Sequence, residues 1–160
     1  MSLGWQEALV AVVLVFVAFL VVKMRPTTAA RGELAADVRA ARDRAREARS
    51  SRERAEALCE AGRLAAGEGR WTAAAGFFLR AMNAEPAWPD AVVQASMSLS
   101  GRRPRLLEKM LWRRLDHVPW DAEHAAAARA AAVALAGLYE GKLRDRARAQ
   151  VMRRMADRIG

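Results

Sequence analysis

Few side chains in this sequence could bind a metal ion or act as a nucleophile. Cys59 is the only cysteine, which excludes an intramolecular disulfide, and His117 and His124 are the only histidines. These three residues are scattered along the chain and lack the spacing of zinc ligands. The sequence also contains no G-x-S-x-G, P-loop or H-E-x-x-H motif. We therefore expect no metal, no cofactor and no catalytic residues, and a protein that is not an enzyme.

Basic side chains could bind an anionic partner instead. The chain has 27 Lys and Arg against 18 Asp and Glu, a net charge of +9. The basic runs Arg102–Arg105 and Arg113–Arg114 occur with Trp112 and Trp120, and arginines beside aromatic rings can hold phosphates and stack on bases. However, Trp112 has helical spacing with Leu111 and Leu115, which is typical of a core. Nucleic acid is therefore the less favoured partner.

The elements that position these residues are predicted to be helical. Beyond its N-terminal apolar stretch the chain is rich in Ala and Arg, whereas Val and aromatic residues, which favour strands, are scarce. The predicted fold is all-α, with one N-terminal transmembrane helix, a helical stalk and an α-solenoid of about three helix pairs. The corresponding segments are 1–25 for the anchor, 26–54 for the basic stalk and 55–160 for the repeat domain.

The anchor is predicted from an apolar run. Fifteen consecutive residues, Ala8–Val22, have no polar side chain, and a helix from Leu3 to Val22 would cover roughly 30 Å. No basic residue precedes the run, whereas Lys23 and Arg25 follow it, which favours a retained anchor over a cleaved signal peptide. By the positive-inside rule the rest of the chain would be cytoplasmic, N-out and C-in, in a bacterial inner membrane.

The stalk is expected to be one long helix over Glu33–Ala57, which contains no Gly or Pro. Its apolar positions form a shallow heptad seam: Leu34, Val38, Ala41, Ala45, Ala48 and Ala55, with Arg52 interrupting it. Because Ala buries little area, the seam supports either a weak coiled coil, and through it a weak homo-oligomer, or a solitary helix. Its arginines face either anionic lipid or solvent.

A 34-residue pattern over 55–88 resembles the tetratricopeptide repeat (TPR) family. The residues that carry the resemblance are Leu58, Ala61 and Gly62 in the first helix, Ala74, Phe78 and Ala81 in the second, and Pro86 at the end. Gly69 and Trp71 occupy the turn. Two further pairs are expected, because one pair cannot bury both of its faces. The second pair is Asp90–Leu99 with Leu106–Leu115, joined by a turn at Gly101–Pro104. The third begins at Asp121 as N-cap, with Glu123 in the first turn, runs through Ala125 to Tyr139, turns at Gly141 and ends with Leu143–Ile159.

The TPR resemblance implies a groove lined by the first helix of each pair. Its partner-binding residues would be Glu56, Cys59, Arg63, Ala66, Val93 and Gln94. Cys59 and Arg63 replace the Lys and Asn with which some members of the family clamp a C-terminal carboxylate, and Arg63 favours an acidic peptide. The expected function is a membrane-anchored scaffold or assembly adaptor that binds a protein or peptide. The alternatives are an accessory structural subunit of a membrane complex and a membrane-tethered nucleic-acid-binding protein.

Overall fold

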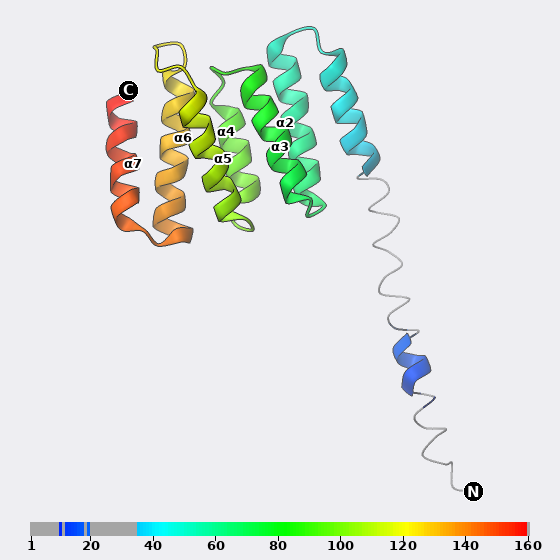
Figure 1. Cartoon of the computed structure of the whole chain (residues 1–160). Helices are drawn as coiled ribbons and strands as arrows, with labels where there is room; N and C mark the ends of the chain where they lie inside the picture. Colours follow the sequence, from blue (N-terminus) through cyan, green and yellow to red (C-terminus); the bar gives the residue numbers. More distant parts are fainter. Residues whose placement is uncertain (1–9, 11, 18, 20–34, 160) are drawn as a thin grey trace, which may run out of the picture. The chain divides into compact units, whose positions relative to one another are not determined.

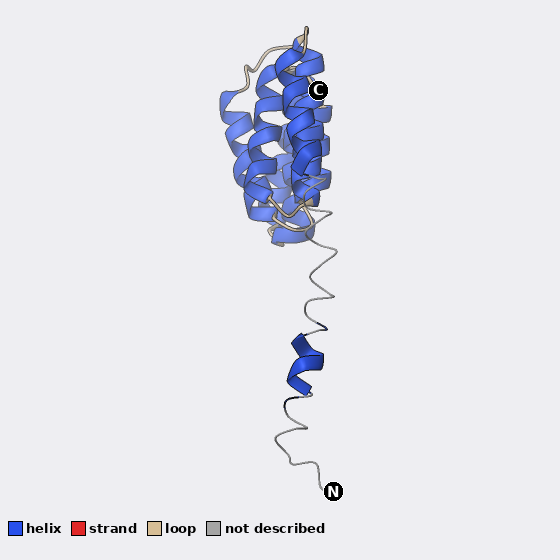
Figure 2. Ribbon diagram, turned by 90° about the vertical axis from the view of Figure 1, so that its right-hand side faces the viewer, coloured by secondary structure: helices blue, strands red, loops and turns tan. Residues whose placement is uncertain are grey.

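The computed structural model describes residues 10, 12–17, 19 and 35–159. Within these residues all regular secondary structure is helical and no strand occurs (Figure 2), which confirms the all-α prediction. The chain divides into two compact units, Met1–Ala36 and Asp37–Gly160.

In the first unit, residues 10, 12–17 and 19 are helical and their side chains are exposed. A search of the described residues finds no helix that has both the length and the apolar character needed to cross a membrane. The prediction of a transmembrane anchor is therefore wrong for the described chain. The physical reason is length, since a bilayer span needs one helix of about 20 apolar residues and the described helical residues of this stretch, 10, 12–17 and 19, are far fewer. The other residues of the expected anchor and its flanks, within 1–9, 11, 18 and 20–34, lie outside the described residues.

The second unit begins within a helix whose described residues are 35–47, and this helix replaces the expected long stalk helix. That helix ends at Glu47 because Ser50 starts a new one: its hydroxyl accepts from the backbone N–H of Glu53 at 3.1 Å, and the Glu53 carboxylate accepts from the Ser50 N–H at 3.3 Å. This is a capping box. Val38, Ala41 and Ala45 of the seam are buried in the chain's own core. The apolar surface of the seam is therefore covered within one chain and needs no second copy to bury it.

The first pair consists of α2 (Ser51–Gly67) and α3 (Trp71–Ala84). Gly69 adopts a positive φ of 75° after α2. Backbone bonds from Gly69 to Ala66 and from Arg70 to Ala65, both 2.9 Å, close a Schellman turn. This turn reverses the chain, so that α3 packs antiparallel to α2. Gly62 lets the helices approach, because a Cβ there would lie 3.0 Å from the Phe78 ring.

Two more antiparallel pairs follow in order across the domain (Figure 1): α4 (Asp90–Leu99) with α5 (Pro104–His117), and α6 (Ala125–Leu138) with α7 (Arg146–Ile159). The first helices pack side by side as α2, α4 and α6, and α3 packs against α5. Consequently the turns within the three pairs lie at one end of the domain, and the connections between pairs lie at the other (Figure 1).

The third pair differs from its prediction at its start and at its turn. Its first helix begins at Ala125 rather than after Asp121, because residues 121–124 form a bend and turn. A π-helical turn, η1 (Tyr139–Leu143), follows α6, and Arg144 rather than Gly141 takes the left-handed conformation, with φ 54°. The Tyr139 hydroxyl fixes this turn to α5: it donates to Glu108 at 2.7 Å and accepts from the Trp112 indole at 2.9 Å. The last helix therefore begins at Arg146, three residues later than expected.

Candidate protein-binding face

The surface formed by α2, α4 and α6 on the side away from the second helices is the candidate protein-binding face. On α4, Val93 and Met97 are one helical turn apart and expose 47% and 79% of their surface. On the adjacent α6, Val133 exposes 55%. Three large apolar side chains on two packed helices thus remain in solvent, whereas the opposite sides of the same helices are buried.

The predicted partner-binding residues divide between this surface and the core. Glu56, Arg63 and Val93 are exposed and Gln94 is half-buried. Cys59 and Ala66 expose only 1% and 7% and pack inside the helix layer, so they cannot contact a partner. Burial, followed by the charge of Glu56, raises the pKa of Cys59 to about 12. The thiol is therefore protonated at neutral pH, and its role is to pack.

Met97 and Val133 were not among the residues predicted to bind a partner. The signal was available on α4, because Met97 follows Val93 by four residues and therefore lies on the same face. It was weaker on α6, where a run of alanines surrounds Val133 and hides which side is buried.

Charged residues border the apolar part of the face. On α2, Arg52 donates to Glu56 at 2.8 Å and lies 4.0 Å above the Trp88 ring, so its charge is engaged within the chain. Within the described residues, neither Arg63 on α2 nor Arg129 on α6 forms an ion pair, and both are exposed. An apolar strip bordered by two unpaired cations can bind an amphipathic segment that carries acidic residues.

The repeat-defining residues lie beneath this face. Leu58, Ala61, Gly62, Ala74, Phe78 and Ala81 are all buried between α2 and α3 or toward their neighbours. Pro86 is half-buried after α3, and its carbonyl accepts a hydrogen bond from Arg114 of α5, which is 95% buried. Burial lowers the pKa of Arg114. These residues therefore serve packing within and between pairs.

The residues named for nucleic-acid binding are not brought together. Arg102–Arg105 lie at the turn between α4 and α5, whereas Trp120 follows the far end of α5. A helix of that length separates them by about 20 Å. Between them, the Trp112 indole N–H donates to Tyr139 and Arg114 donates to Pro86, so both donors are engaged within the chain. The Trp112 side chain is 42% exposed rather than part of the core.

The candidate metal ligands are also apart. Cys59 lies in α2, and His124 precedes α6. His117 ends α5, and its Nδ1 donates to the Arg113 carbonyl at 2.8 Å. The His124 ring lies 2.6 Å from Asp121, and this hydrogen bond lowers the pKa of Asp121. Among the residues that the structure describes, no group of three His, Cys, Asp or Glu could hold a metal ion.

Comparison of the chain with protein-family models, with curated proteins and with solved structures finds no match.

Proposed function

We propose that this protein is a non-catalytic scaffold or adaptor that binds an amphipathic, acidic peptide segment of another protein on the face of α2, α4 and α6. The observation that carries the proposal is the joint exposure of Val93, Met97 and Val133 on two packed helices. Exposed apolar clusters of this kind mark interaction surfaces, since solvating them has a free-energy cost that a partner removes. The TPR resemblance of 55–88 supports the same surface, because it is the first helices that face a partner in that family.

Charge makes the proposal more specific. Arg63 and Arg129 border the apolar strip without acidic partners among the described residues. They would attract an acidic segment and orient it, while the three apolar side chains would contribute most of the affinity.

A photo-crosslinking experiment tests the proposal. A benzophenone amino acid replaces Met97 in the full chain, expressed in its native cell, and mass spectrometry identifies the crosslinked protein. We expect one discrete adduct, and we expect Val133→Asp to remove it because this change places a charge in the strip without disturbing the core. The matched control places the crosslinker at Trp120, which is 60% exposed elsewhere. An adduct that forms equally from Trp120, or that survives Val133→Asp, would show that this face is not the binding surface.

A further inference from the structure

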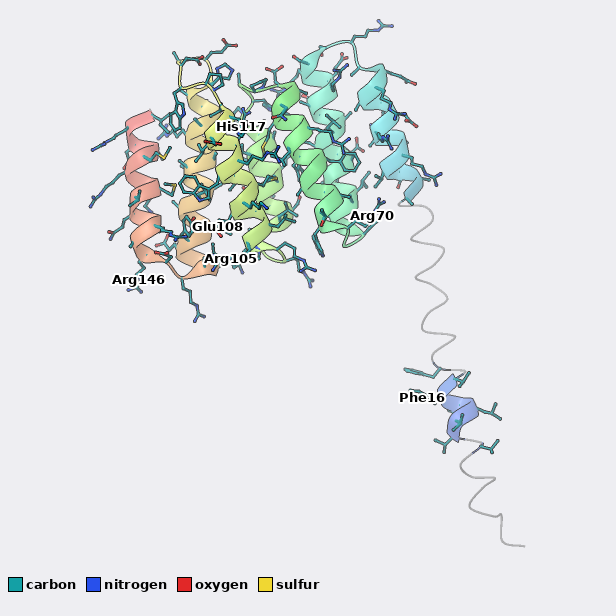
Figure 3. All side chains as sticks on the ribbon, viewed as in Figure 1. Phe16, Arg70, Arg105, Glu108, His117 and Arg146 are labelled. Atoms are coloured by element: carbon teal, nitrogen blue, oxygen red, sulfur yellow. The ribbon has the colours of Figure 1, made fainter. Side chains whose placement is uncertain are left out.

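A hollow of about 680 Å³ lies between the turns of the first two helix pairs. Four arginines line it, Arg70 from one turn and Arg102, Arg103 and Arg105 from the other, together with Trp71 and Leu106. We call it the arginine pocket. It lies apart from the protein-binding face, at the end of the domain where the turns within pairs gather. Figure 3 shows Arg70, Arg105 and Arg146 at this end and His117 at the opposite end.

Two of the four guanidinium groups are already paired. Arg70 donates to Glu68 at 3.2 Å, and Arg105 donates to Glu108 at 3.0 Å. The side chains of Arg102 and Arg103 have no acidic partner within the described residues and are exposed. The pocket therefore has about two positive charges that the chain does not neutralise, and a ligand with about two negative charges would balance them.

The backbone adds to this positive potential. The pocket is lined by the first turns of both α3 and α5, which start side by side because consecutive pairs stack in the same direction. No side chain caps either helix, and the N-cap positions are Arg70 and Arg103. A cation at the positive end of a helix dipole is unfavourable. Ser50 and Glu53 cap α2, and Asp145 accepts from the Arg148 N–H at the start of α7. Helices α4 and α6 also lack a side-chain cap, but their N-cap positions are Pro89 and His124 rather than arginine.

The wall of the pocket is mixed rather than uniformly polar. Trp71, Ala73, Pro104 and Leu106 contribute apolar surface between the guanidinium groups. The volume lies within the roughly 300–1,000 Å³ of small-molecule sites, which is more than one phosphate group needs. The pocket can thus hold an apolar body as well as an anionic group.

We propose that the arginine pocket binds a small organic molecule that carries a phosphate monoester. Such a group has a charge of about −1.5 to −2 at neutral pH and three acceptor oxygens, which match the two unpaired guanidinium groups. A carboxylate or a phosphodiester supplies a single negative charge and leaves one arginine uncompensated. Arg102 and Arg103 hold the phosphate, and the apolar wall between α3 and α5 contacts the rest of the molecule.

Titration calorimetry with phenyl phosphate and the full chain tests this proposal. Phenyl sulfate is the matched probe, because it has the same shape with one negative charge. We expect saturable binding of one phenyl phosphate per chain, at least fivefold tighter than phenyl sulfate. The double variant Arg102→Ala, Arg103→Ala should weaken it at least tenfold, and Arg102→Lys, Arg103→Lys should weaken it less, since charge remains but paired donors are lost.

The matched control removes two arginines from the neighbouring turn at the same end. The double variant Arg144→Gly, Arg146→Ala should leave phenyl phosphate binding unchanged, and circular dichroism should show that each variant keeps its helices. Equal weakening by both double variants would mean diffuse attraction along the edge, and absence of saturation would mean no site; either outcome overturns the proposal. Tighter binding of a fifteen-residue oligothymidylate, weakened by both double variants, would overturn it in favour of a nucleic-acid track across the turns.

Discussion

The close approach of α2 and α3 rests on Gly62, and replacing this glycine by alanine tests it. The new methyl carbon would lie 3.0 Å from two ring atoms of Phe78, whose side chain is completely buried. Overpacking costs about 1–3 kcal/mol, whereas the higher helix propensity of alanine returns about 1 kcal/mol. We therefore expect the free energy of unfolding to fall by up to about 2 kcal/mol.

Urea denaturation of the full chain, followed by circular dichroism, measures this change. Gly137→Ala in α6 is the control, because nothing lies within 4 Å of its added methyl group and only the propensity gain of up to about 1 kcal/mol applies. In addition, Phe78→Leu should reduce the cost of Gly62→Ala when the two are combined, since it removes the ring atoms that clash. If Gly62→Ala stabilises the protein as much as Gly137→Ala does, the steric explanation of Gly62 is refuted.

Three further predictions concern Cys59, Ser50 and Arg114. Since burial raises the pKa of Cys59 to about 12, iodoacetamide at pH 8 should alkylate this thiol only after denaturation. Rapid alkylation of the native protein, detected by mass spectrometry, would contradict the burial of Cys59. Ser50→Ala removes the capping box of α2 and should cost about 1 kcal/mol in urea denaturation; Arg54→Ala, at an exposed position of the same helix, is the comparison. Arg114→Ala leaves the Pro86 carbonyl without its donor and should cost about 1.5–3 kcal/mol, so an unchanged denaturation midpoint would show that this bond contributes nothing.

The helices with strong sequence boundaries were predicted well. The observed bounds of α4, Asp90–Leu99, are the predicted ones, because Pro89 precedes the helix and a Gly-containing turn follows it. The α5 helix was predicted two residues short at each end, since Pro104 was assigned to the turn although proline is favoured in the first helical turn. Helix boundaries of this kind can be predicted from neighbouring residues alone, without knowledge of the rest of the fold.

The break after residue 47 was missed for a different reason. The segment has no Gly or Pro, and the heptad spacing of its alanines suggested one continuous helix. The signal that was overlooked is the Ser50-x-x-Glu53 pattern, which ends one helix by starting the next. Once the chain turns there, the seam residues Val38 and Ala41 are buried in the chain's own core instead of facing solvent or a second copy.

The arginine pocket could not be found from sequence spacing, because Arg70 and Arg102 are brought together only when consecutive pairs stack. The runs of arginine suggested a site with Trp112 and Trp120, and the fold places Trp71 beside Arg102–Arg105 instead. What the sequence does contain is a local inconsistency: two adjacent helices start at arginines, where the helix dipole favours an acceptor or an anion. Departures from such local rules tend to occur at functional sites, where a ligand supplies the missing compensation.

The exposed apolar strip on α4 and α6 is a second departure, and it points to a second, separate partner. The two sites can therefore be tested independently: Arg102→Ala with Arg103→Ala should leave crosslinking from Met97 intact, and Val133→Asp should leave phenyl phosphate binding intact.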